Sequence, residues 1–261
     1  MVVVAALLAQ SDPESRSWNQ PVAPFRIAGN IYYVGATEIT SFLIATPNGH
    51  IVVDGGFVET APQILANIRT LGFRPEDVKV LLNSHAHLDH AGGLAALKLA
   101  TRASLQIMEG DAVQIENGGR MDFAFGDRLT FPPVKVDKVL HDGDVVALGG
   151  TKLVARRTAG HTKGCTTWTT NAEGHPVVFV CSTTSPGYQL RGNAAYPNIV
   201  EDFRETFRTL ATLPCDIFLA AHGSFFHLAQ KMKTKDFVDP QGYRGFIERS
   251  RREFERQLEQ R

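Results

Sequence analysis

Asn83-Ser84-His85-Ala86-His87-Leu88-Asp89-His90 follows an apolar run at residues 78–82 that is typical of a buried strand. Four of its last six residues carry imidazole or carboxylate groups, which are common zinc ligands. His85 and His87 are two residues apart, so in an extended segment they point the same way and can bind one ion. Asp89 and His90 are adjacent and can serve a second ion where the chain bends. Four ligands this close together cannot all reach one tetrahedral ion without strain, so the spacing predicts two metal ions.

Each ion still needs a third ligand, and two further histidines occur in the same context as this stretch. His161 and His222 each follow a predicted buried strand and precede a Thr or a Gly. They are therefore the candidates for the remaining ligands. Three other histidines lie in turn or charged settings and are expected to be in solvent: His50, His141 and His175. His227 follows two phenylalanines and could line a pocket instead.

The bulk composition excludes some classes of partner. The 27 basic and 27 acidic residues cancel, so no overall field favours nucleic acid or an anionic membrane. No apolar run approaches the roughly 18 to 20 residues that a membrane-spanning helix needs. We therefore expect neither nucleic acid nor a membrane as a partner. Residues 1–9 resemble the apolar part of a secretory signal without its basic segment, and we interpret them as a signal remnant, with a disordered tail as the alternative.

Short β-rich runs alternate with helical patterns along the rest of the chain. Two successive β-rich halves each finish in helices, which predicts an α/β protein with two sheets packed face to face and helices outside. We assign residues 1–24 to an N-terminal extension and residues 25–261 to one domain. Predicted strands include residues 78–82, 134–136, 166–169, 177–180 and 216–221, and predicted helices include residues 60–71 and 199–210. The region 116–131 has no clear period and is expected to be a long loop that borders the pocket.

With His161 and His222 added, the motif His85-Ala86-His87-Leu88-Asp89-His90 resembles that of the metallo-β-lactamase superfamily, and the resemblance covers residues from about 31 to 229. It implies a four-layer αββα sandwich of two mixed sheets, with the metals at the edge between the sheets. One zinc ion would be held by His85, His87 and His161, and a second by Asp89, His90 and His222. Asp54 resembles the buried Asp that supports the ligand loop in this family. A helix-capping or turn role is the alternative for Asp54.

The superfamily contains several hydrolases, so the fold alone does not decide the activity. Its lactonases and thioesterases place a metal-bridging Asp after the strand that corresponds to residues 177–180, whereas residues 181–185 of this chain hold no carboxylate. Residues 185–190 resemble β-lactamases of subclass B3, which have a His at the position of His90 and a Ser that does not bind metal at the position of Ser182. Cys181 is then expected to be a small buried apolar residue. Cys215 lacks the C-terminal partner that it has in relatives, so no disulfide is expected there.

The resemblance implies zinc-dependent hydrolysis of the β-lactam ring of penicillins, cephalosporins and carbapenems by a zinc-bound hydroxide, which gives antibiotic resistance. Asp89 would orient the nucleophile or move its proton, and Tyr188 would donate a hydrogen bond to the carbonyl oxygen, so both are predicted to be catalytic. Ser182, Thr184 and Tyr188 match positions that contact substrate in relatives, with ordinary packing as the alternative. We expect a monomeric, periplasmic or secreted enzyme that acts on a small-molecule β-lactam.

Two other functions are compatible with a metal site of this kind. A lactonase or thioesterase of the same fold would need the bridging carboxylate that residues 181–185 do not supply. A metal-binding regulatory or chaperone-like module would be expected to lack a ligand or to have a blocked pocket. All six predicted ligands are present in this chain, which favours the enzyme.

Overall fold

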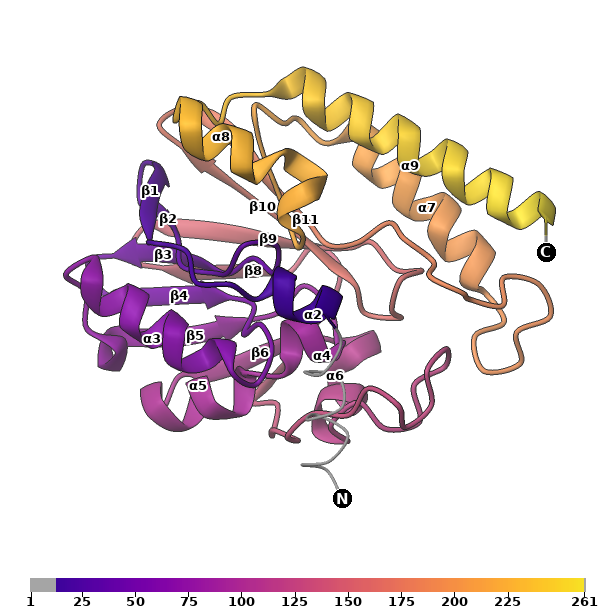
Figure 1. Cartoon of the computed structure of the whole chain (residues 1–261), viewed down its shortest axis with the longest axis horizontal. Coiled ribbons are helices and arrows are strands. Elements are labelled where there is room, and N and C mark those ends of the chain that lie inside the picture. The colour runs from indigo at the N-terminus through magenta and orange to yellow at the C-terminus, as the bar shows by residue number, and fades with distance from the viewer. Residues whose placement is uncertain (1–12, 261) are drawn as a thin grey trace.

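The computed structural model describes residues 13–260, so the signal-like segment at residues 1–9 lies outside the described residues. Two β-sheets pack face to face and carry helices on their outer sides (Figure 1). The first sheet has the order β1 (Phe25–Ala28), β2 (Ile31–Tyr33), β3 (Phe42–Thr46), β4 (Gly49–Val53), β5 (Val78–Leu82), β6 (Ser104–Met108) and β7 (Lys138–Leu140). The second sheet has the order β12 (Ile217–Ala220), β11 (His175–Val180), β10 (Thr166–Ala172), β9 (Thr151–Arg157) and β8 (Val145–Leu148).

Both sheets are mixed. In the first sheet β1 to β4 are antiparallel and β4 to β7 are parallel. In the second sheet β8 to β11 are antiparallel and β12 runs parallel to β11. The described helical segments are α2 (Pro13–Trp18), α3 (Thr60–Thr70), η1 (Pro75–Asp77), α4 (Leu88–Ala91), α5 (Leu94–Thr101), α6 (Glu109–Glu116), α7 (Ile199–Thr212), η2 (Gly223–Phe226), α8 (Leu228–Thr234) and α9 (Pro240–Gln260). The expected αββα sandwich is confirmed.

The alternation of side chains along β4 shows why the first sheet is buried on both faces. Ile51 and Val53 belong to the core between the two sheets. Val52 points to the opposite face, where it joins a second core with Ile64 and Ile68 of α3. Because successive strand side chains point to opposite faces, a continuous apolar run supplies both cores at once.

The helices α7 and α9 extend the core on the outer side of the second sheet (Figure 1). Phe203 of α7 lies with its ring centroid 4.7 Å from that of Phe254 of α9, and Phe207 lies 5.8 Å from the same ring. These apolar positions recur every three to four residues, which places them on one face of each helix. The amphipathic helix predicted at residues 199–210 is confirmed.

The sequence prediction was wrong at two places in the first sheet, one beside the edge strand β7 and one in the central strand β4. Residues 134–136 do not form a strand; the edge strand β7 follows at Lys138–Leu140. The backbone N–H of Val136 donates to Glu116 at 3.0 Å, so this segment is bonded to the end of α6 instead of to a neighbouring strand. His50 is buried at 7% exposure, because β4 begins at Gly49 and the imidazole packs 4.9 Å from the ring of Phe73.

The described part of the N-terminal extension is joined to the sandwich. The carbonyl of Trp18, at the end of α2, accepts the backbone N–H groups of Glu38 and Ile39 at 2.9 and 3.3 Å. The predicted boundary at residue 25 coincides with the start of β1. The division into an extension and one domain stays a prediction.

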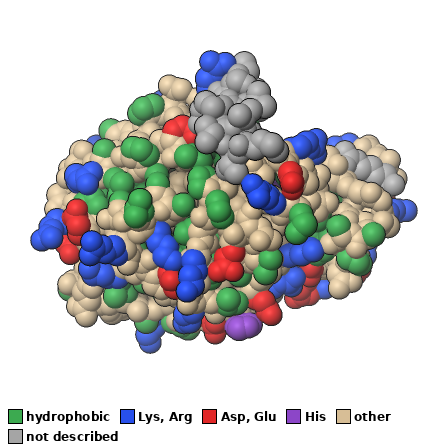
Figure 2. Space-filling view, turned by 90° about the horizontal axis from the view of Figure 1, so that it is seen from below, with side chains coloured by type: hydrophobic (Ala, Val, Ile, Leu, Met, Phe, Trp, Pro, Cys, Tyr) green, Lys and Arg blue, Asp and Glu red, His purple; other side chains and the backbone are tan. Residues whose placement is uncertain are grey.

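Basic and acidic side chains are interspersed on the face shown in Figure 2, with apolar side chains between them. Such a surface creates no large field of one sign on that face. Within residues 13–260, none of the helices combines the length and the apolar character that crossing a bilayer requires.

Candidate metal centre and pocket

The predicted ligands meet at one edge of the sandwich, because each of them follows a strand that ends there. The strand β5 leads to His85 and His87, β9 leads to His161, and β12 leads to His222. Backbone bonding holds the last of these ends in place, since the N–H of Gly223 donates to the carbonyl of Glu38 at 2.7 Å. The site is therefore built from both halves of the chain.

The short helix α4 turns the second half of the motif into the site. The carbonyl of His87 accepts the N–H groups of His90 and Ala91 at 3.1 and 2.7 Å, so the chain coils as soon as the extended His-Ala-His segment ends. The glycine after this turn is required by a close approach. A Cβ added to Gly93 would lie 2.2 Å from the carbonyl oxygen of Gly55, so only glycine fits there.

The first predicted ligand group converges. His85, His87 and His161 offer ring nitrogens that all lie within 4.8 Å of one another. Nδ1 of His87 and Nε2 of His161 face each other at 3.0 Å. Nδ1 of His161 donates to the carbonyl of Thr184 at 2.8 Å, which leaves the lone pair of a neutral imidazole on Nε2. This arrangement suits a cation held between the nitrogens.

The second predicted ligand group lies beside the first. Nε2 of His90 is 3.3 Å from Nε2 of His222, and Oδ2 of Asp89 is 3.3 Å from the former and 3.6 Å from the latter. The rings of His85 and His90 are 4.3 Å apart between centroids, so the two groups share a border. The structure thus brings together all six residues predicted as ligands.

Each of the five imidazoles has an oxygen atom near the ring nitrogen that points away from the centre. Metal-binding histidines usually have such a partner, which fixes the ring and the tautomer. The partners are Ser84 Oγ for His85 (3.0 Å), Asp122 Oδ2 for His87 (3.7 Å), Asp54 Oδ2 for His90 (3.4 Å), the Thr184 carbonyl for His161 (2.8 Å) and Glu38 Oε1 for His222 (3.7 Å). The donor set and its surroundings fit a metal centre.

Asp54 supports the ligand loop, as the sequence suggested. Its Oδ1 accepts hydrogen bonds from the side chain of Asn83 at 2.8 Å and from the backbone N–H of Ser84 at 2.6 Å. It does not cap α3, whose N-cap residue is Glu59. The supporting interpretation of Asp54 is confirmed over the capping one.

The electrostatics of the site favour the neutral form of three imidazoles and the charged form of His90 and Asp89. Burial, together with the neighbouring histidines, lowers the pKa of His85 and His161 well below the usual value, and burial lowers the pKa of His222 to about 4. Burial alone would raise the pKa of Asp89, but His90 holds it well below its ordinary range. Burial would also lower the pKa of His90, but Asp89 and Asp54 raise it to about 10. The same carboxylates would offset the charge of bound cations.

A cavity of about 660 Å³ opens over the two groups. That volume lies in the range of pockets that take drug-sized molecules. Aromatic and aliphatic side chains form much of its wall: Trp18, Phe57, Leu88, Phe125, Leu129 and Phe225. His87, Asp89, His161 and His222 lie on its lining as well. The prediction that the long loop 116–131 borders the pocket is confirmed, through Phe125 and Leu129.

The three predicted substrate contacts are placed differently. Thr184 is exposed and lines the cavity. Ser182 is buried, with its hydroxyl 3.1 Å from that of Thr184. Tyr188 is also buried, and its hydroxyl donates to the carbonyl of His161 at 3.0 Å. The roles of all three in substrate binding stay predictions.

Several residues of the site were missed by sequence reasoning. Asp122 and Glu38 lie outside the motif, in segments with no regular pattern, and only the fold brings them to His87 and His222. Trp18 lies in a segment assigned to the extension, yet its ring is 5.7 Å from that of His222. No local signal marks these three positions.

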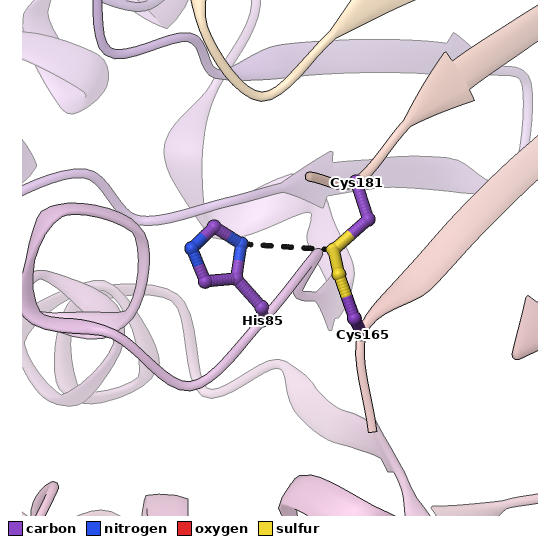
Figure 3. A group of neighbouring side chains, drawn as sticks. All are labelled: His85, Cys165 and Cys181. Carbon is purple, nitrogen blue, oxygen red and sulfur yellow. Dashed lines mark hydrogen bonds between the residues drawn. A yellow bond between two sulfur atoms is a disulfide. The ribbon is translucent and has the colours of Figure 1, made fainter. Parts of the chain in front are cut away.

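A disulfide joins Cys165 and Cys181 beside the first ligand group, as Figure 3 shows. Sγ of Cys181 lies 3.7 Å from Nδ1 of His85. The expected burial of Cys181 is confirmed, at 0% exposure, but the residue is half of a disulfide, which the sequence prediction did not include. The hairpin carried a signal for this pair: β10 and β11 pair Trp168 with Phe179, so their extension brings residue 181 opposite residue 166, next to Cys165. Cys215 is free.

Comparison with known proteins decides the family. The family model described as the metallo-beta-lactamase superfamily matches residues 34–222. The chain belongs to the metallo-β-lactamase superfamily. Membership implies a hydrolase that binds metal ions, in agreement with the histidine-rich groups described above.

Solved structures of this family match nearly the whole chain. The FEZ-1 metallo-β-lactamase from Legionella gormanii is 42% identical with a TM-score of 0.91, over 93% of this chain and 97% of that chain. BJP-1, a subclass B3 metallo-β-lactamase of Bradyrhizobium japonicum, is 34% identical with a TM-score of 0.88, over 94% and 97%. A Cronobacter sakazakii metallo-β-lactamase with a HARLDQ motif is 43% identical with a TM-score of 0.92, over 94% and 97%. This chain has His-Ala-His-Leu-Asp-His at residues 85–90.

Curated relatives match shorter stretches. A probable metallo-hydrolase of Burkholderia pseudomallei is 34% identical over 110 residues, which are 42% of this chain and 36% of that protein. An N-acyl homoserine lactonase of Rhizobium radiobacter is 37% identical in an alignment of 82 positions that covers 23% of this chain and 31% of the lactonase. The chain thus matches about a third of the length of these relatives.

Proposed function

We propose that this protein is a zinc-dependent β-lactamase of subclass B3 that hydrolyses penicillins, cephalosporins and carbapenems and gives resistance to them. The observation that carries the proposal is the convergence of His85, His87 and His161 beside Asp89, His90 and His222, at the floor of an apolar cavity. The absence of a carboxylate from residues 181–185 supports a β-lactamase over the lactonases. The similarity to a subclass B3 enzyme supports the subclass.

Two zinc ions are the proposed cofactors, one for each ligand group. When bound, zinc supplies Lewis acidity and a nucleophile derived from water at neutral pH. The protein's own contribution is to hold the imidazoles in one orientation before metal or substrate arrives. Ser84 and the Thr184 carbonyl do this for His85 and His161, and Asp54 does it for His90.

The cavity is the proposed place of substrate binding. Aromatic side chains such as Trp18 and Phe125 form a wall suited to the apolar parts of a β-lactam. We propose that the hydroxyl of Thr184, which lines the cavity, donates to the substrate carboxylate, with Ser182 holding it in place from behind. Tyr188 is proposed to assist at the carbonyl oxygen, close to the His161 backbone to which its hydroxyl is bonded.

Asp89 is the proposed proton carrier. Its carboxylate lines the cavity and lies within 3.6 Å of both His90 and His222. A carboxylate in that position can orient the attacking water and accept its proton, and can then pass the proton to the leaving amide nitrogen. The ring opens when the amide bond breaks and the nitrogen takes up that proton.

The test is hydrolysis of a carbapenem and of a chromogenic cephalosporin, followed by absorbance with and without a chelator. We expect turnover of both substrates, loss of turnover with the chelator, and recovery when zinc is restored. A thioester and an acyl homoserine lactone serve as competing substrates. Chelator-sensitive turnover of either competitor, without turnover of any β-lactam, would overturn the proposal in favour of the lactonase or thioesterase alternative.

The proposal includes a monomer in the periplasm or outside the cell. Fractionation of producing cells with antibody detection tests the location, and light scattering of the purified protein tests the oligomeric state. Resistance is tested by expressing the chain in a susceptible bacterium and comparing it with the His90→Ala variant. Equal inhibitory concentrations for the two strains would contradict the resistance role.

A further inference from the structure

Asp111 is a buried carboxylate outside the predicted site, in the first turn of α6. It is 2% exposed and accepts three hydrogen bonds. Its Oδ2 accepts the backbone N–H of Ala86 at 2.9 Å and the hydroxyl of Thr162 at 2.7 Å. Its Oδ1 accepts the backbone N–H of Gly164 at 2.7 Å. All three groups are donors, so the geometry calls for a residue with acceptor oxygens only.

The three donors belong to the two segments that carry the first ligand group. Ala86 stands between His85 and His87, and Thr162 follows His161 directly. One carboxylate therefore connects the backbone of the His-Ala-His segment to the loop of the third histidine. These segments are far apart in the sequence and belong to different halves of the sandwich, so their relative position depends on such contacts.

The backbone of α6 is shaped for this connection. A Cβ added to Gly110 would lie 2.3 Å from the carbonyl oxygen of Lys163, and one added to Gly164 would lie 2.3 Å from the backbone nitrogen of Asp111. Glycine at both positions lets the start of α6 touch the loop after His161. This close backbone contact places the side chain of Asp111 within hydrogen-bonding distance of its three donors.

We propose that Asp111 is a positioning residue that sets the metal affinity of the group His85, His87 and His161. Asp111 bonds to the backbone of Ala86 and Gly164 and to the hydroxyl of Thr162. The carboxylates of Asp54, Asp122 and Glu38 differ in that each also places an oxygen near a ligand imidazole. The inference rests on the proposed zinc site and adds a determinant of its affinity. Without Asp111 the two segments keep their ligands but lose three of the hydrogen bonds that hold them at the right separation, and the bond from the N–H of Thr166 to the carbonyl of Ser84 at 2.7 Å remains.

The experiment compares the variants Asp111→Asn, Thr162→Val and Thr162→Ser with the full-length wild-type protein. Asparagine at position 111 keeps the shape of the side chain but places an amide NH₂ against the hydrogen-bond donors. At position 162, valine removes the hydroxyl group and serine retains it. The matched control is Asp137→Asn, because Asp137 also accepts a backbone N–H, from Leu105 at 2.8 Å, but connects no ligand segments. Zinc affinity is measured on the metal-free protein by competition with a chromophoric chelator. The absorption spectrum of the cobalt-loaded protein reports the ligand geometry.

We expect Asp111→Asn to weaken binding at the first group by about 10- to 100-fold, as for other residues that support metal ligands. The cobalt spectrum should change with it. Thr162→Val should weaken binding less, and Thr162→Ser and Asp137→Asn should match the wild type. Wild-type affinity and spectrum in Asp111→Asn would overturn the inference. If Asp111→Asn does not fold by circular dichroism, the difference between Thr162→Val and Thr162→Ser decides, and equal affinities would overturn it.

The experiments distinguish a failure of the proposed function from a failure of the inference about Asp111. A wild-type protein that binds zinc but hydrolyses no β-lactam would overturn the proposed substrate and leave the role of Asp111 to the affinity measurements. A wild-type protein that binds no zinc would overturn both.

Discussion

The disulfide between Cys165 and Cys181 leads to a quantitative prediction about stability. It closes a loop with a sequence separation of 16 residues. Restricting a loop of that length in the unfolded chain is worth about 3 kcal/mol in the chain-entropy description. For a protein of this size that free energy corresponds to a fall in Tm of roughly 6–12 °C when the bond is absent.

Because the disulfide is buried, the method of removing it matters. Both cysteines are 0% exposed, so a reductant reaches them only when the chain opens. Urea unfolding is therefore compared with and without a phosphine reductant present throughout, and with the Cys165→Ala/Cys181→Ala variant without reductant. The metal-free protein is used for every sample, because metal bound only to the folded state would add stability of its own.

The matched control is Cys215→Ala, which removes the free cysteine and leaves the bond intact. Burial raises the pKa of the Cys215 thiol to about 12, so it reacts slowly with thiol reagents while the protein is folded. The unfolded, unreduced wild-type protein should show one reactive thiol per chain. Three reactive thiols would show that the disulfide is absent. The same free energy of unfolding with and without reductant would contradict the predicted contribution of the bond to stability.

Three further predictions concern the metal groups and the cavity. His90→Ala should reduce bound zinc from two ions to one per chain, as measured by elemental analysis. An unchanged count would contradict the proposed assignment of three ligands to each zinc ion. Glu38→Gln should lower the affinity for the second metal ion by about tenfold in chelator competition, because Glu38 Oε1 lies 3.7 Å from Nδ1 of His222. An unchanged affinity would show that Glu38 only bonds to the loop after β12 and does not support the metal ligand. Trp18→Ala should raise KM for a cephalosporin several-fold at unchanged zinc content, because it removes part of the cavity wall, whereas loss of zinc would assign Trp18 to the metal centre.

The chemistry of the metal centre could be predicted from the sequence because its ligands are concentrated in residues 85–90. Ligand type and spacing are local properties, and so is the apolar run that makes β5 a buried strand. The positions of His161 and His222 could also be inferred, since each follows a strand. The amphipathic pattern of α7 and the apolar runs of the central strands were readable for the same reason.

Errors arose where backbone partners were decided by contacts distant in sequence. Residues 134–136 have the composition of a strand, but Val136 bonds to Glu116 at the end of α6. His50 follows a turn signal, yet its place in β4 buries it against Phe73. In both cases the local pattern was compatible with more than one environment, and packing selected one.

The residues and the family resemblance were enough to name the groups that can bind metal, the strands that carry them and the bridging carboxylate that is missing. Only the tertiary structure decided what stands behind each ligand: Asp122 and Glu38 beside the imidazoles, Asp111 between the two ligand segments, and the disulfide against His85. The physical reason is that ligand identity is a property of single side chains, whereas ligand orientation depends on where the ends of separate strands meet. The relative position of these strand ends is determined by the packing of the two sheets, which depends on residues outside 83–90.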